Sequence, residues 1–121
     1  MAVPKEDPVS DEVLAALDQM TAALVGTERR AREIVERGKG HTRDRAAGRS
    51  WRDITHAEDR PRTLDLLRET LDALQHANSR YRRALAQELH AEGVAMQRIA
   101  EMFGVTRQRV AHILKGQDEQ A

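Results

Sequence analysis

Residues 96–114 read MQRIAEMFGVTRQRVAHIL, and this stretch decides the fold of the C-terminal part of the chain. Counted from Met96, the small residue Ala100 falls at the fifth position, where two crossing helices must approach each other closely. Gly104 falls at the ninth position, where a tight turn requires a left-handed backbone that glycine adopts without steric cost. This joint register predicts a helix-turn-helix.

The remaining residues of the stretch fit the same motif. Thr106 is expected to cap the second helix, because a threonine hydroxyl can accept hydrogen bonds from the first backbone amides of a helix. The side chains left on the open side are polar or basic, namely Arg107, Gln108, His112 and Lys115. Apolar residues have the spacing that two short packed helices require, and they are Ile99, Phe103, Val105, Val110 and Ile113.

Composition is typical of a small intracellular protein. The 121 residues can form one compact domain, or a small domain with a helical extension, around an aliphatic core, because only three residues are aromatic. The absence of cysteine predicts a cytoplasmic protein without disulfides or thiolate chemistry. The first residues are polar and acidic, unlike a signal peptide, and no apolar run is long enough for a membrane span. Arginine outnumbers lysine by 17 to 3, which suggests a bacterial, GC-rich genome.

Charge is unevenly distributed along this formally neutral chain. Residues 93–115 carry four basic side chains against one acidic side chain, whereas residues 1–27 carry one against five. Nucleic-acid binding requires a local basic face and not a basic total, so the C-terminal segment qualifies. Residues 28–62 carry eleven basic side chains against seven acidic ones. These arginines have two interpretations, a solvated surface with ion pairs or direct phosphate contact.

A first long helix is expected to begin at Ser10, which has an N-cap signature, after a disordered segment 1–9. The glycines of Gly38-Lys39-Gly40 are expected to end it. Ordinary packing and dimerisation both explain the heptad-like apolar seam of this helix. The seam comprises Val13, Leu17, Met20, Leu24, Thr27, Ala31 and Ile34.

A second long helix is expected from about residue 60 to 92, with Pro61 in its first turn and Gly93 as its C-cap. The division predicted from these elements is a helical scaffold at 10–83, a helix-turn-helix region at 84–116 and a tail at 117–121. The apolar seam of the second helix is interrupted by one polar residue, Asn78. It comprises Leu64, Leu67, Leu71, Leu74, Asn78, Tyr81 and Leu85.

Between the two seams, residues 43–54 resemble residues 90–99 at an offset of 45, since Gly48, Trp51 and Ile54 match Gly93, Met96 and Ile99. Ser50 and Asp53 can form a capping box for a short helix at 51–58. The match has two interpretations, a degenerate repeat of one helix–glycine–helix unit or a chance similarity of short segments. In either case Trp51 and Ile54 are expected to fill a core between the two long helices. The predicted fold is therefore all-α, with two long helices, a short helical segment between them and a C-terminal helix-turn-helix.

Residues 84–115 resemble the helix-turn-helix of region 4 in bacterial primary-type sigma factors. The run FGVTRQRV at 103–110 is very close to the FGVTRERI pattern of that family. The chain departs from the pattern at Gln108, where the family has an acid, and at His112, where it has glutamine. No stretch resembles the sigma regions that melt promoters or bind the polymerase clamp. The chain is therefore more similar to small standalone regulators that carry this unit.

In helix-turn-helix proteins the second helix lies in the major groove of double-stranded DNA, and helix 106–115 is expected to do so here. Arg107 suits a bidentate contact to guanine, Gln108 suits one to adenine, and Ala111 suits a thymine methyl group. His112 and Thr106 lie on the same expected interface. Phosphate contacts are expected from Gln97, Arg98, Arg109 and Lys115.

Three functions remain open on the sequence alone. The first is a sequence-specific, DNA-binding transcriptional regulator. The alternatives are a weakly specific, nucleoid-associated DNA-coating protein and a module that docks on RNA polymerase or another protein. A homodimer is expected, with residues 11–37 forming much of its interface. No enzyme, cofactor or metal site is predicted, because the five histidines are scattered and no phosphate-binding glycine loop follows a strand.

Overall fold

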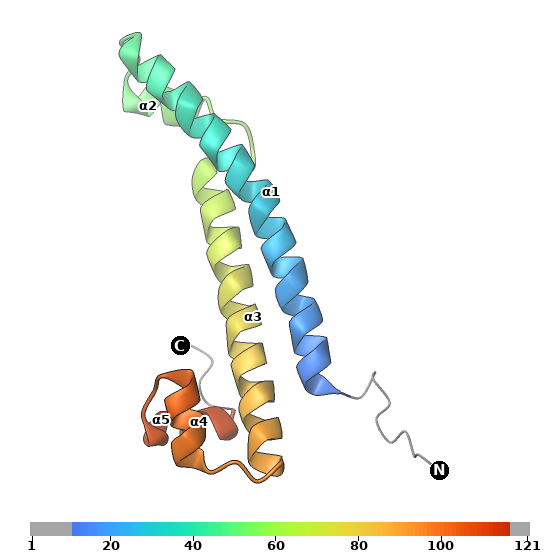
Figure 1. The fold of residues 1–121 in the computed structure, drawn as a ribbon. Helices are drawn as coiled ribbons and strands as arrows, with labels where there is room; N and C mark the ends of the chain where they lie inside the picture. The colour runs from blue at the N-terminus through green and yellow to red at the C-terminus, as the bar shows by residue number, and fades with distance from the viewer. Residues whose placement is uncertain (1–10, 117–121) are drawn as a thin grey trace. The chain divides into compact units, whose positions relative to one another are not determined.

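The computed structural model describes residues 11–116, and within them it contains five helices and no strand. The helices are α1 (Glu12–Ala46), α2 (Trp51–His56), α3 (Thr63–Ala91), α4 (Met96–Phe103) and α5 (Arg107–Leu114), as Figure 1 shows. This confirms the all-α fold with two long helices, a short helix between them and a C-terminal helix pair. The expectations for residues 1–9, for Ser10 and for the tail 117–121 lie outside the described residues.

The chain divides into two compact units, and each long helix contributes to both. Among the described residues, one unit consists of residues 11–22 and 74–116, and the other of residues 23–73. Among the described residues, no helix combines the length and the apolar character that crossing a membrane requires.

The first turn of α1 is capped by Asp11. Its carboxylate oxygen accepts hydrogen bonds from the backbone amides of Val13 at 3.0 Å and Leu14 at 3.2 Å. These amides have no partner within the helix, so an aspartate at this position stabilises the helix start. The structure therefore assigns the cap to Asp11, one residue after the expected position.

The expected end of the first helix at Gly38–Gly40 is wrong, because α1 continues to Ala46. A glycine inside a helix costs only about 1 kcal/mol relative to alanine, which neighbouring contacts can offset. The additional turns carry His41, whose Nε2 lies 3.0 Å from the Glu58 carboxylate. The helix ends where Gly48 adopts a positive φ of 95°.

Glu58 links the end of α1 to the start of α3 within the unit formed by residues 23–73. Its nearly buried carboxylate accepts hydrogen bonds from the Thr63 backbone amide at 3.3 Å and from the Thr63 hydroxyl. The Arg37 guanidinium lies 3.8 Å from the same carboxylate. Burial by itself raises the pKa of Glu58, but the hydrogen bonds from Thr63 and His41 outweigh it and hold the pKa below its ordinary value.

The short helix α2 is confirmed in position but ends at His56 and not at residue 58. Its cap is Ser50, whose hydroxyl accepts a hydrogen bond from the Asp53 amide at 3.1 Å. Ile54 is buried as expected, but Trp51 is 52% exposed. Because Trp51 is the first residue of α2, its ring lies outside the core and instead faces the Arg45 guanidinium, 5.7 Å from the ring centroid.

The second long helix begins at Thr63 and ends at Ala91, so Pro61 lies before the helix and not in its first turn. The carboxylate of Asp65 accepts a hydrogen bond from the Arg62 amide at 3.0 Å, and the Glu58 carboxylate binds the Thr63 amide. These two acids satisfy the amides at the helix start and fix it two residues beyond the proline.

The two apolar seams are only partly buried. Where the start of α1 lies beside α3, the small side chains Ala16 and Ala77 are buried, while Leu17 is exposed. In the unit formed by residues 23–73, Arg30 of α1 donates a hydrogen bond to the Thr70 hydroxyl of α3 at 2.7 Å, while Leu67 and Leu71 are exposed. Residues beside the seams therefore take part in the α1–α3 contacts, and several leucines of the seams are left exposed.

The segments matched at an offset of 45 share one backbone geometry. Gly48 and Gly93 have φ values of 95° and 93°. The Arg49 amide bonds to the Asp44 carbonyl at 3.1 Å, and the Val94 amide bonds to the Leu89 carbonyl at 3.0 Å. Ile54 and Ile99, three residues into the following helices, are both buried. A helix–glycine–helix geometry thus occurs twice in the described residues. The two occurrences differ in the length of the second helix, which has 6 residues in α2 and 8 residues in α4.

Candidate nucleic-acid interface

The helix-turn-helix is built around a small aliphatic core. Its fully buried members come from the end of α3, from α4 and from α5, and they are Ala86, Ile99, Ala100, Val110 and Ile113. The partly buried residues packed against them include Leu89, Val94, Met96, Phe103, Val105 and Leu114. All the apolar residues predicted to face inward therefore belong to this core or pack against it.

The turn between α4 and α5 has the predicted geometry. Gly104 has φ 68° and ψ 34°, which is the left-handed conformation, and it ends α4. The Val105 amide reaches back to the Ala100 carbonyl at 3.0 Å, which closes the helix end. Ala100 is 2% exposed, as a residue at a close helix crossing must be.

The start of α5 is fixed by Thr106, as predicted. The Thr106 hydroxyl accepts a hydrogen bond from the Arg109 amide at 3.0 Å, and its backbone has the extended conformation typical of an N-cap. Val110 and Ile113 are buried, while Arg107, Gln108 and His112 are exposed on the same helix. The helix therefore presents an apolar side to the core and a polar, basic side to solvent.

The nine residues proposed from the sequence all lie on α4, α5 or their caps, and none is buried. Seven of them are exposed: Gln97, Arg98, Thr106, Arg107, Gln108, His112 and Lys115. Arg109 and Ala111 are half-buried. The structure thus groups all nine in one small region of the chain.

Two residues that position the helices were missed in the sequence. Gln87 of α3 donates a side-chain hydrogen bond to the carbonyl of Leu114, the last residue of α5, at 3.4 Å. Arg82 of α3 lies over the Phe103 ring of α4, 5.6 Å from its centroid. Both residues link helices distant in sequence, so local periodicity carries no signal for either contact.

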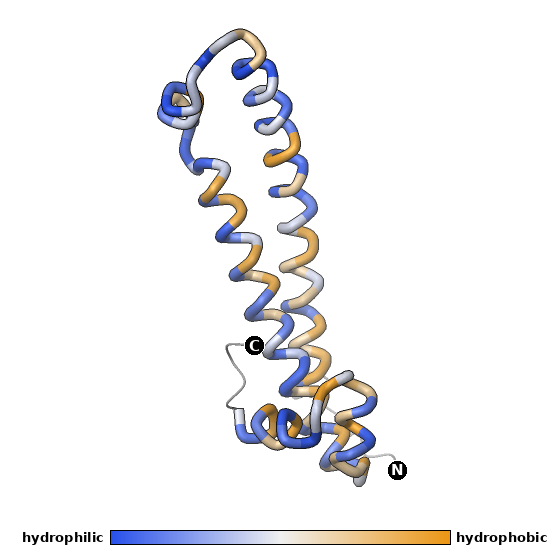
Figure 2. Tube along the Cα trace, turned by 90° about the vertical axis from the view of Figure 1, so that its left-hand side faces the viewer, coloured by the Kyte–Doolittle hydropathy of each residue, from blue (hydrophilic) through white to orange (hydrophobic). Residues whose placement is uncertain are grey.

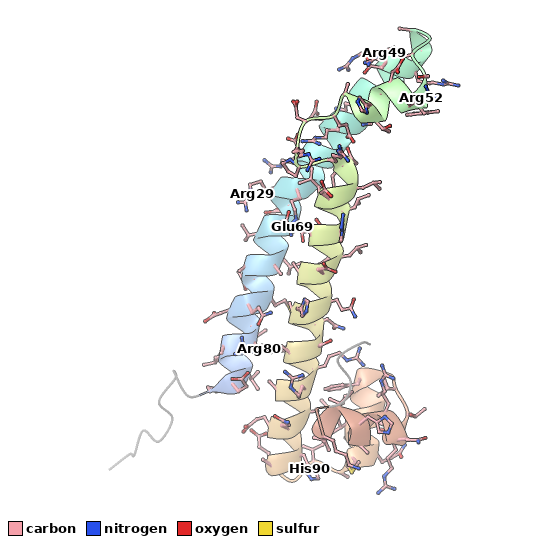
Figure 3. All side chains as sticks on the ribbon, turned by 180° about the vertical axis from the view of Figure 1, so that it is seen from behind. Arg29, Arg49, Arg52, Glu69, Arg80 and His90 are labelled. Atoms are coloured by element: carbon pink, nitrogen blue, oxygen red, sulfur yellow. The ribbon has the colours of Figure 1, made fainter. Side chains whose placement is uncertain are left out.

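Acidic side chains also border the motif. Arg98 forms an exposed ion pair with Glu101 at 3.3 Å, and such surface pairs contribute little to stability. At the end of α3, a hydrogen bond shared with Glu92, together with burial and repulsion between the carboxylates, raises the pKa of Glu88. Figure 3 labels His90, which lies between these acids in the last turns of α3.

Comparison with known proteins supports the same region. Residues 77–120 match the family model of the homeodomain-like domain. The match covers the last turns of α3 together with α4 and α5, and it supports a small helix-turn-helix DNA-binding domain. No curated protein and no solved structure matches the chain.

Residues 11–116 contain no group of three or more histidine, cysteine, aspartate or glutamate side chains arranged to hold a metal ion.

Proposed function

We propose that the protein is a sequence-specific transcriptional regulator that reads the major groove of double-stranded DNA with α5. The observation that carries the proposal is the geometry of one helix. Thr106 caps α5, Val110 and Ile113 attach it to the core, and Arg107, Gln108 and His112 are exposed on its other side. A helix presented in this way can enter the major groove with its first residues on base edges.

Individual roles follow from hydrogen-bonding capacity. The Arg107 guanidinium can donate two hydrogen bonds to guanine, and the Gln108 amide can pair with adenine. The Ala111 methyl group suits contact with a thymine methyl group, and His112 lies exposed one residue further along. Backbone phosphates suit the remaining members of the group, Gln97, Arg98, Arg109 and Lys115.

We further propose a cellular setting and an assembly for this protein. The arginine-rich composition and the likeness of residues 103–110 to sigma region 4 suggest a bacterial protein that acts on the nucleoid in the cytoplasm. A single helix-turn-helix buries little surface on DNA, so we propose a homodimer that places two recognition helices about 34 Å apart. We expect residues 11–37 to supply much of its interface.

Two other functions remain as alternatives. A nucleoid-associated coat protein would use the same motif with little sequence preference, and the eleven basic residues in 28–62 favour this reading. A docking module for RNA polymerase would be in keeping with the sigma-like sequence. Copurification with polymerase in the absence of DNA would favour the docking module.

Salt-dependent footprinting on a site selected from random DNA tests the proposal. Specific binding should exceed nonspecific binding by about 10³-fold or more. Arg107→Ala should cost about 1–3 kcal/mol on that site and relax the preference at one base pair. A full-length protein that covers DNA uniformly, with Arg107→Ala unchanged, would instead indicate a coat protein.

A further inference from the structure

An exposed apolar surface lies on one side of the helix pair in the unit formed by residues 23–73. On α3, Leu64 is 74% exposed, Leu71 is 64% exposed and Leu67 is also exposed. On α1, Leu24 and Val35 are each at least half exposed. Figure 2 shows that hydrophobic residues recur along both long helices. Isolated exposed leucines are ordinary, but a contiguous group marks an interaction surface.

The register of the two helices places these residues on the same side. The inward residues are identified by the Arg30–Thr70 hydrogen bond and by the burial of Leu66. Leu67 and Leu71 each follow an inward residue of α3 by one position. On α1, Ala31 follows Arg30, and Val35 follows the half-buried Ile34.

One residue further along a helix turns the side chain by about 100°. α1 and α3 are packed side by side and run in opposite directions, as Figure 1 shows for this unit. This rotation of the side-chain direction is therefore counter-clockwise on one helix and clockwise on the other when both are viewed from one end. As a result, both sets of side chains point to the same side of the pair, and we call this side the leucine face.

The charges beside the leucine face decide what can cover it. On α1, Arg32 lies between Glu28 and Glu36, and on α3, Arg68 lies between Asp65 and Asp72. Each edge thus has acids on both sides of one arginine. DNA and anionic membranes require a basic surface, which this face lacks. A surface with both signs on both edges can pair opposite charges with a copy of itself across a two-fold axis.

We infer that the leucine face binds the leucine face of a second copy of this chain, forming a four-helix bundle. Steps of three and four residues between the leucines suit the side-chain packing of such bundles. This inference rests on the proposed function in one respect, since pairing would give the DNA-binding region its second copy. It also moves the expected interface, because residues 64–71 of α3 take part beside α1.

The decisive experiment compares the full-length protein with the double variant Leu67→Gln/Leu71→Gln. Light scattering should give a dimer for the unmodified protein and half that mass for the variant, with equal helical circular dichroism. Affinity for DNA with two half-sites should fall about 100-fold in the variant, because the two helix-turn-helix units would then bind independently. Affinity for a single half-site should stay unchanged.

Val25→Gln is the matched control. Val25 is 52% exposed and follows Leu24 by one residue, which turns its side chain away from the leucine face. The Val25→Gln variant should therefore remain a dimer. If the double variant fails to fold, Leu64→Gln replaces it, since a side chain with that exposure contributes little to the monomer core.

The outcomes separate the two proposals. A monomeric unmodified protein that binds DNA specifically would overturn the leucine-face interface and leave the proposed function standing. A double variant that stays dimeric would also overturn it. A dimer dissociated by the double variant, but without specific DNA binding, would support the interface and contradict the regulator function.

Discussion

Glu58 is the residue for which the structure predicts a pH-dependent effect on stability. Its pKa is held below the ordinary value in the folded chain, with burial opposing and the hydrogen bonds from Thr63 and His41 prevailing. A carboxylate with a lowered folded pKa stabilises the fold fully above its unfolded pKa. That stabilisation is lost as the pH falls through the lower folded pKa.

Glu58→Gln should therefore lower the free energy of unfolding at pH 7 by about 2 kcal/mol, the size expected for hydrogen bonds to a buried charged group. The difference from the unmodified protein should shrink as the pH drops below the ordinary glutamate pKa of about 4.3. Thermal melts at several pH values would measure this difference, with Glu69→Gln at an exposed position of α3 as the control. An unchanged melting temperature at pH 7 would contradict the assigned role of Glu58.

Gly104 carries the conformational demand of the turn. Its φ of 68° costs a residue with a side chain about 1–2 kcal/mol, and a β-branched residue more. A Cβ at this position would meet no atom within 4 Å, so the cost is in the backbone and not in steric overlap. Gly104→Val should thus destabilise the motif and weaken DNA binding.

Gly104→Asn is the matched control, because asparagine tolerates the left-handed region. It should retain most of the stability and DNA affinity that the valine variant loses. Melting curves and DNA titrations of the two variants make the comparison. Equal losses in both would mean that the glycine is required for another reason.

At the scale of elements, α1 contains two glycines that do not break it. An alanine Cβ at Gly38 would meet no atom within 4 Å, and the helix continues through this position. Gly38→Ala should therefore raise the free energy of unfolding by about 0.5–1 kcal/mol. Gly48→Ala should lower it, since Gly48 has a positive φ. Denaturant melts should shift in opposite directions, and a shared direction would contradict the assigned helix end.

These elements also show what the sequence can predict. Thr106, Gly104 and Gly93 act through local backbone chemistry, so their roles could be identified from neighbouring residues alone. Gly38 and Gly48 look alike in the sequence, but the additional turns of α1 are held by His41 and Glu58, which are 17 residues apart. Local patterns carry no information about such a contact.

The same limit applies to the seams. Heptad spacing identified Leu67 and Leu71 as members of an apolar stripe, but it could not state which partner covers them. Buried alanines such as Ala77 form the inner side of the helix pair, and alanine is too common in this chain to be a signal. For the candidate interface, all nine residues could be proposed from the sequence. The apolar spacing within a helix-turn-helix fixes which side faces its core, and the remaining side is open.

For the whole molecule, the salt dependence of DNA binding tests both the placement of charge and the assembly. Arg98, Arg109 and Lys115 are the charged residues proposed to contact phosphates. Each phosphate neutralised contributes about −0.9 to the slope of log K against log salt. One helix-turn-helix with these three contacts should therefore give a slope of about −2.7, and a dimer on two half-sites should give about −5.4. A zero net charge does not reduce these values, since counterion release depends on the contacts made.

Lys115→Ala should make the slope less steep by about 0.9 for each bound helix-turn-helix. It should weaken binding to all DNA sequences about equally. The control is Arg52→Ala on α2, an exposed arginine outside the proposed interface, labelled in Figure 3. Its slope should equal that of the unmodified protein. If Arg52→Ala reduces the slope while Lys115→Ala does not, phosphate contact comes from residues 28–62. The basic middle of the chain would then be a DNA-coating surface, and α5 would not carry the electrostatic part of binding.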